Sequence, residues 1–136
     1  MQLVLVPGSF AVCRLSKAVD TGRLTQPWFL AATGDEVSLV CRSEDVPVGT
    51  TATEDGWTLL KVDQALDFGL VGVIAQISQT LATAKVPVFV ISTYLTDYVM
   101  VKTQRLPDAT MALADAGLWR SPTRLASNDT CDVVAS

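Results

Sequence analysis

The chain has 136 residues, of which 49% are hydrophobic and 18% charged, with a formal net charge of −4 at pH 7. This composition is typical of a folded protein, and the length allows one ordinary core or two very small ones. A negative charge without a basic run argues against nucleic acid and anionic membranes as partners. The absence of histidine excludes Ser-His and Cys-His nucleophile pairs and removes the commonest transition-metal ligand.

The three cysteines are odd in number and lack the paired spacing of a zinc or redox motif. Cys13 and Cys41 lie within strand-like runs, so we interpret them as core thiols. The apolar run at residues 3–6 is too short for a signal peptide, and no run approaches membrane-spanning length. We therefore expect a cytoplasmic protein in a reducing compartment, without a membrane partner.

The first half of the chain is predicted to consist of short strands without a long helix. Apolar and alternating runs predict strands at residues 3–6, 10–15, 28–32 and 36–42, the first two separated by the turn signal Pro7-Gly8. Between residues 15 and 28 there is no room for a four-turn helix, which needs about fifteen residues. Residues 43–56 are charged and contain Pro and Gly, which predicts a linker or a long loop.

The second half is predicted to follow the order β-α-β-β-α from residue 57, with strands at 57–63, 86–92 and 97–102. Apolar residues recur at helical spacing between the first two strands, at Leu70, Val73, Ile74, Ile77, Leu81 and Ala84, and predict a helix of about four turns. A second helix is predicted at residues 106–116, with Pro107 in its first turn and Gly117 after its end. Residues 120–136 have no period and are expected to be mobile.

The two halves align at a shift of 61 residues, which places Glu36 on Asp97. This alignment predicts a repeat with an incomplete N-terminal unit at residues 1–56, a C-terminal unit at residues 57–119 and a tail at 120–136. The first unit has less helical cover than the second. A bare sheet face is covered either by the other half or by another chain.

Two polar or glycine-containing segments predict a small-ligand site. The first, Ser92-Thr93-Tyr94-Leu95-Thr96-Asp97, follows an apolar run and joins two predicted strands. Polar groups at such a corner are costly to bury without a partner. The second, residues 67–72, brings two glycines to the start of the predicted helix. Together they indicate a binding site made from one loop and one strand end, rather than a catalytic centre.

The sequence resembles the tandem ACT-domain proteins related to the CASTOR arginine sensors, from about residue 3 to residue 118. The segments that carry the resemblance are residues 10–15 (FAVCRL), 36–41 (EVSLVC), 66–72 (LDFGLVG) and 92–98 (STYLTDY). The resemblance implies an α+β fold of two ferredoxin-like ACT units that associate further through their sheets, so we expect a homo-oligomer. It also implies that an amino acid binds between the turn at residues 67–73 and the strand segment at residues 92–97, and that its binding changes assembly or partner affinity.

The ligand-binding residues that the resemblance implies are Asp67, Phe68, Gly69, Leu70, Gly72, Val73, Thr93, Tyr94, Thr96 and Asp97. The sensors place a glutamate in the helix-opening turn where this sequence has Leu70. A guanidinium group facing leucine loses a charge-assisted hydrogen bond, a cost of roughly 1.5–3 kcal/mol. The sequence therefore argues against arginine, and an apolar or small amino acid fits better.

Each of these residues also has a purely structural interpretation. Asp97 either meets a ligand ammonium or caps the turn at residues 94–96. Gly69 and Gly72 either expose amides to a ligand carboxylate or allow close packing, with Asp67 as a helix N-cap. Tyr94 is either a pocket wall or an ordinary core aromatic. Glu36 is expected to be structural, which leaves one working site per chain.

The sequence thus favours a non-enzymatic, amino-acid-binding regulatory protein with a possible regulated protein partner and no cofactor or metal. The alternative is a protein–protein assembly module whose pocket is vestigial. An enzyme that uses the carboxylates Asp35, Glu36, Asp67 and Asp97 is a third interpretation. It is disfavoured because no nucleophile or metal cluster accompanies them.

Overall fold

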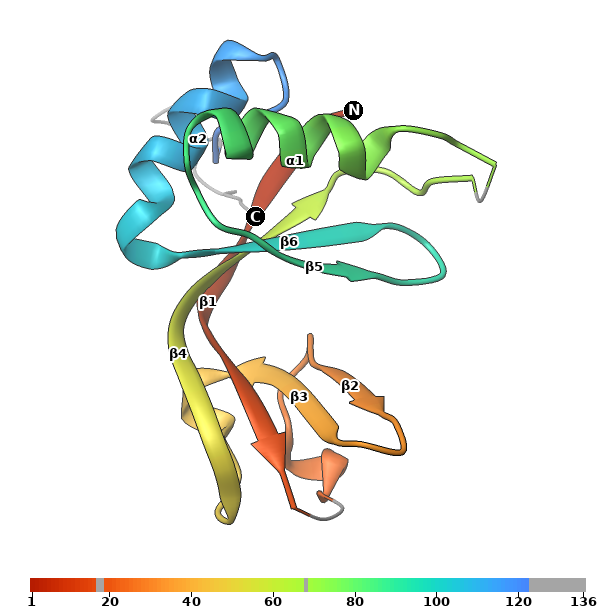
Figure 1. The fold of residues 1–136 in the computed structure, drawn as a ribbon, viewed down its shortest axis with the longest axis vertical. Coiled ribbons are helices and arrows are strands. Elements are labelled where there is room, and N and C mark those ends of the chain that lie inside the picture. The colour runs from red at the N-terminus through yellow and green to blue at the C-terminus, as the bar shows by residue number, and fades with distance from the viewer. Residues whose placement is uncertain (17–18, 68, 123–136) are drawn as a thin grey trace, which may run out of the picture. The chain divides into compact units, whose positions relative to one another are not determined.

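The computed structural model describes residues 1–16, 19–67 and 69–122, which form six strands and two α-helices. The chain divides into two compact units. Unit 1 combines Met1–Pro7 with the chain from Thr58 onward, and unit 2 is Gly8–Trp57. The long strands β1 (Leu3–Leu15) and β4 (Thr50–Val62) each contribute to both units (Figure 1).

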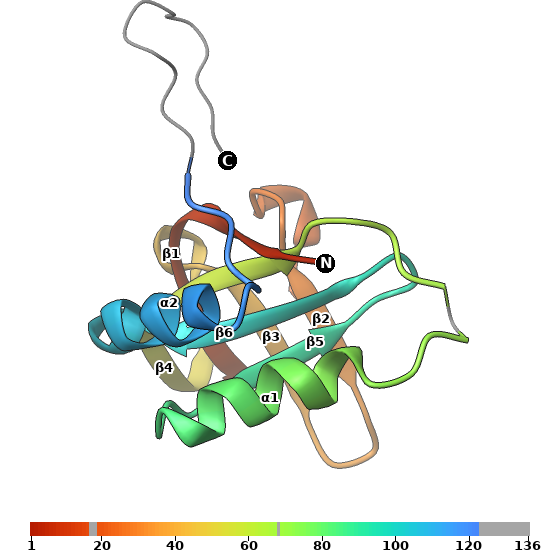
Figure 2. The ribbon, with the colours of Figure 1, turned by 90° about the horizontal axis from the view of Figure 1, so that it is seen from above.

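Unit 1 has the predicted order of elements. After β4 come α1 (Val73–Thr83), β5 (Phe89–Ser92), β6 (Asp97–Lys102) and α2 (Leu106–Asp115). The strand order is β1-β4-β6-β5, so the first residues of β1 occupy the position of the last strand in a ferredoxin-like β-α-β-β-α-β unit. Strands β5 and β6 are antiparallel, and both helices lie on one face of this sheet (Figures 1 and 2).

The core of unit 1 lies between these helices and the sheet. Its buried residues are Leu3, Leu60, Val62, Ile77, Leu81, Val86, Val99, Val101, Ala109, Leu113 and Leu118. The apolar stripe of α1 is confirmed at Ile77 and Leu81, whereas Leu70 lies outside the helix and is 51% exposed. The helix starts later than predicted because Gly72, in a left-handed conformation at φ 91°, forms its N-cap.

Unit 2 has the strand order β2-β3-β1-β4, with β2 (Phe29–Ala32) and β3 (Val37–Arg42) antiparallel. Its buried core residues are Ala11, Cys13, Leu15, Leu39 and Cys41. The described residues of unit 2 include two short 3-10 turns and no α-helix. The predicted reduction of helical cover in the first half is therefore confirmed for these residues.

Two expectations for the long strands were wrong. Residues 43–56 are not a linker, because β4 begins at Thr50 and only Ser43–Asp45 forms a 3-10 turn. Charged residues are tolerated here because β4 is the last strand of unit 2 and this part of it is exposed. The Pro7-Gly8 pair does not end β1, since proline is tolerated in a strand at the edge of a sheet and Gly8 adopts φ 112°.

The chain remains attached to unit 1 after α2, beyond the predicted end of ordered structure. The Arg120 amide donates to the Leu3 carbonyl at 2.9 Å, and its guanidinium pairs with Asp63. Arg120 is therefore held, contrary to the expectation of a mobile tail from this residue. The rest of the predicted tail from residue 123, including Cys131, lies outside the described residues. Within the described ranges, no helix is both long enough and apolar enough to cross a bilayer.

The buried thiols of unit 2 predict an alkaline loss of stability. Burial is the main cause that raises the pKa of Cys41 to about 12, and the neighbouring Cys13 adds to it. The folded protein therefore keeps this proton to higher pH than the unfolded chain, whose thiols titrate near pH 8.5. The contribution of the protonated Cys41 thiol to the free energy of unfolding is complete below about pH 8.5. It is lost as the pH rises towards 12, by up to about 1.4 kcal/mol per pH unit.

The measurement is the free energy of unfolding in urea between pH 8 and pH 10.5. Other side chains also titrate in alkaline solution. The informative quantity is therefore the slope of the unfolding free energy against pH, compared between the wild type and Cys41→Ala. We expect a shallower slope in the variant. Equal slopes would contradict the assignment of this pH dependence to Cys41.

Candidate functional site

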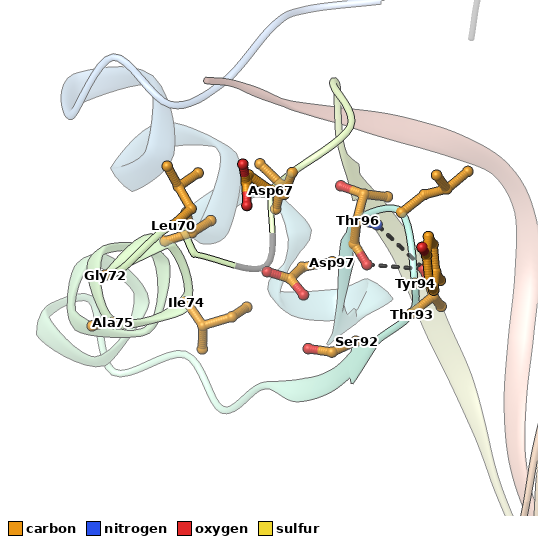
Figure 3. A pocket seen from close by; sticks show the side chains of 13 residues that line it. Asp67, Leu70, Gly72, Ile74, Ala75, Ser92, Thr93, Tyr94, Thr96 and Asp97 are labelled. Carbon is orange, nitrogen blue, oxygen red and sulfur yellow. Dashed lines mark hydrogen bonds between the residues drawn. The ribbon is translucent and has the colours of Figure 1, made fainter.

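A pocket of about 350 Å³ lies within unit 1, where the turn between β4 and α1 faces the β5–β6 hairpin (Figure 3). Its lining residues are Leu66, Asp67, Leu70, Gly72, Val73, Ile74, Ala75, Ser92, Thr93, Tyr94, Leu95, Thr96 and Asp97. The pocket therefore forms between the two segments that the sequence singles out.

Two hydrogen bonds hold these segments together. The Leu66 amide, in the turn, donates to the Leu95 carbonyl at the hairpin tip, with an N–O distance of 2.7 Å. The Thr96 hydroxyl donates to the carbonyl of Val62, the last residue of β4, at 3.2 Å. Since β4 leads directly into the turn, the two bonds fix the hairpin against the end of β4 and the first part of the β4–α1 connection.

The backbone amides of Gly69 and Leu70 are used within the helix-opening turn. The Gly69 amide donates to the Asp67 carboxylate at 2.8 Å, and the Leu70 amide donates to the Asp67 carbonyl at 2.9 Å. Asp67 therefore caps this turn, and the N-cap of α1 is Gly72, which has no side-chain capping bond. The first amides of an α-helix have no partner within the helix, and Val73 lies at this end of the pocket.

Asp97 faces this helix start from the opposite wall. In Figure 3 its carboxylate points from the beginning of β6 towards the turn that carries Asp67, with Ser92 beside it. Ser92 and Asp97 are paired at the base of the hairpin. The carboxylate is partly buried, and no hydrogen bond or ion pair joins it to another described residue.

The structure separates the two interpretations of the hairpin residues. The turn is closed by Thr93, whose amide and hydroxyl both donate to the Thr96 carbonyl, at 2.9 and 3.0 Å. Asp97 is therefore not the cap of this turn. The Thr96 hydroxyl belongs to a buried residue, and the Thr93 hydroxyl oxygen already accepts from the Thr96 amide at 3.4 Å. Neither oxygen is therefore a freely exposed acceptor for a ligand ammonium. Tyr94 is 77% exposed and is not a core residue.

Eight of the ten residues implied as ligand-binding line this pocket, and two do not. Gly69 lies outside the lining and its amide is already donated to Asp67. Phe68 lies outside the described residues. The pocket also includes five residues that the sequence did not single out as contacts, Leu66, Ile74, Ala75, Ser92 and Leu95. Ile74 belongs to the predicted helical stripe and Ser92 to the hydroxyl-rich segment, so both carried a usable signal.

The hairpin of unit 2 repeats that of unit 1, but at a shift of 60 residues and not 61. Phe29 pairs with Val40 as Phe89 pairs with Met100. The turn is also repeated, since the amide and hydroxyl of Thr33 both donate to the Glu36 carbonyl, at 2.9 and 3.3 Å.

The corrected register changes which residues correspond. Glu36 is the counterpart of Thr96, and the counterpart of Asp97 is the apolar Val37. Unit 2 therefore has no carboxylate at the place where Asp97 faces the pocket of unit 1. The predicted alignment of Glu36 with Asp97 is therefore wrong.

Comparison with known proteins agrees with this fold. Residues 52–115 match the family model of the ACT domain. No protein with a curated description matched the sequence.

Among solved structures, a structural-genomics protein from Agrobacterium tumefaciens is 25% identical, with a TM-score of 0.79 over 90% of this chain and 94% of that one. A Vibrio cholerae protein of unknown function, described as a possible transport protein, is 21% identical, with a TM-score of 0.66 over 84% and 88%. Aspartokinase alpha and beta subunits are 13% identical, with a TM-score of 0.62 over 86% and 97%. The last two likenesses concern the fold alone.

Proposed function

We propose that this protein is a non-enzymatic regulatory protein that binds a free amino acid in the pocket of unit 1. In this proposal unit 2 is a second, reduced ACT-like unit, and the whole chain is a cytoplasmic, self-associating relative of the CASTOR-type tandem proteins. The match of residues 52–115 to the ACT domain supports a regulatory role that involves amino acids. The observation that carries the proposal is the position of the Asp97 carboxylate opposite the start of α1.

This arrangement is complementary to a zwitterion. The amides at the start of α1, near Val73 and Ala75, present partial positive charge to a ligand carboxylate. The Asp97 carboxylate lies across the pocket and is available to an α-ammonium. Leu66, Leu70 and Ile74 supply apolar surface for a side chain.

The charge of the lining predicts which amino acids are rejected. Asp67 and Asp97 both face the pocket, and the described lining contains no lysine or arginine. An acidic side chain would therefore add a negative charge next to two carboxylates, and like charges repel one another. We expect aspartate and glutamate to bind much more weakly than neutral amino acids.

A thermal-shift screen of the twenty L-amino acids tests the proposal. An amino acid present at a hundred times its dissociation constant should stabilise the protein by about 2.7 kcal/mol. The N-acetyl derivative of the best amino acid is the matched control, because it keeps the side chain and carboxylate but lacks the ammonium. The proposal is abandoned if no amino acid raises the unfolding temperature, or if the acetylated form does so equally well.

A second function is an assembly module with a pocket that binds nothing. It is favoured by the exposure of four large apolar residues on the two segments around the pocket, Leu70, Val71, Tyr94 and Leu95. Exposed apolar surface of this kind is typical of contact with another protein. Light scattering separates the functions, because an assembly module keeps the same mass with and without amino acids.

A further inference from the structure

We propose that Thr96 is the positioning residue of this site, whose hydroxyl holds Asp97 opposite the start of α1. The inference rests on the proposed function, since it concerns how the same pocket is kept ready for a ligand. Thr96 does not meet the ligand through its hydroxyl, which donates to the Val62 carbonyl at 3.2 Å. It acts through Asp97, the next residue along the chain.

The burial of Thr96 makes this bond important. Its side chain is 4% exposed, and only Thr58 among the other described polar residues is comparably buried. A buried hydroxyl needs a partner, and the Val62 carbonyl supplies it across 34 positions of sequence. The bond joins the end of β4 to the start of β6. Any widening of this junction would move the Asp97 carboxylate away from α1.

The hairpin of unit 2 shows that the turn itself does not require this hydroxyl. Thr33 closes the same turn as Thr93, with the same donor and acceptor atoms. Yet the counterpart of Thr96 is Glu36, which is exposed and whose side chain accepts a hydrogen bond from Ser38 of the following strand, β3. The hairpin turn forms with either threonine or glutamate at this position. The buried hydroxyl of Thr96 and its bond to Val62 are therefore a feature of unit 1 and not a requirement of the turn.

The Leu66–Leu95 hydrogen bond gives a way to observe the junction without a ligand. The Leu66 amide donates to the Leu95 carbonyl at 2.7 Å, immediately before Thr96. If Thr96 holds the hairpin against β4, losing its hydroxyl should increase opening at this neighbouring bond. Amide hydrogen exchange at Leu66 reports such local opening.

The experiment compares three variants of the full chain. Thr96→Val keeps the shape of the side chain but removes the donor, and Thr96→Ser keeps the donor. Thr58→Val is the matched control, because Thr58 is 5% exposed, lies in unit 1 outside the pocket lining, and shares a hydrogen bond of 2.8 Å with Thr103. The probe is the L-amino acid that stabilises the wild type most in the thermal-shift screen, titrated by calorimetry.

We expect Thr96→Val to bind this amino acid about tenfold or more weakly and to exchange its Leu66 amide faster. Thr96→Ser should retain the wild-type affinity, and Thr58→Val should lose stability but not affinity. Wild-type affinity or unchanged Leu66 exchange in Thr96→Val would overturn the proposal. A wild type that binds no amino acid would contradict the proposed function instead, and exchange at Leu66 would then decide the role of Thr96 by itself.

Discussion

Replacing Asp97 by asparagine is expected to weaken amino-acid binding strongly while leaving the unliganded protein as stable as the wild type. The substitution keeps the size of the side chain but removes the charge that faces the start of α1. Loss of a charged partner for an ammonium in a partly buried site costs about 2–5 kcal/mol, so the affinity should fall by a factor of about 30 or more. Stability should change by less than about 0.5 kcal/mol, because the carboxylate makes no hydrogen bond to another described residue.

Asp35→Asn is the control for this variant. It removes the same charge at the tip of the unit 2 hairpin, on an exposed residue outside the pocket. We expect its affinity to equal that of the wild type. Calorimetric titration with the best amino acid, and denaturant unfolding without it, provide the two measurements. Binding by Asp97→Asn at the wild-type affinity would show that the carboxylate is not the ammonium partner.

The largest expected effect on stability follows from Leu81→Ala. Leu81 is 0% exposed, lies on the apolar face of α1 and belongs to the core between the helices and the sheet of unit 1. Truncating a buried leucine removes its burial and leaves a cavity, at a cost of about 2–5 kcal/mol. The free energy of unfolding should decrease by this amount in urea titrations followed by circular dichroism.

Met111→Ala provides the comparison, because Met111 is on α2 but 65% exposed. Its removal should cost less than about 0.5 kcal/mol, since surface substitutions away from special features have small effects. A similar loss in both variants would mean that the apolar faces of the helices are assigned incorrectly. A cost below 1 kcal/mol for Leu81→Ala would contradict its place in the core.

Several elements could be predicted because their signals are local. The order from residue 57, the two strands of the unit 2 hairpin and the stop of α2 before Gly117 all follow from side-chain periodicity and backbone preference. The two segments that line the pocket were also recognisable. One places hydroxyls and a carboxylate at a strand junction, and the other places two glycines at the start of the predicted helix. Neither the pattern of the elements nor the composition of the two segments depends on residues distant in sequence.

The roles of individual residues within the site could not be predicted in this way. Asp67 caps a turn and Gly72 begins α1, although both positions allowed other arrangements. The hydroxyl of Thr96 points to Val62, a partner 34 residues away that no local pattern reveals. The apparent match of Glu36 to Asp97 failed for a related reason, because only the pairing of the strands fixes the register. A shift of one residue moves every side chain of a strand to the other face.

The sequence by itself determined the type and order of the elements and the two segments that form the pocket, since turn chemistry and hydrophobic period act over a few residues. Only the tertiary structure decided that β4 begins at Thr50, that the hairpins correspond at a shift of 60 residues, and which polar groups remain available to a ligand. These outcomes depend on strand pairing and on hydrogen bonds between distant residues. Such bonds form only once the chain has folded, and they alone distinguish Asp97 from the threonines beside it.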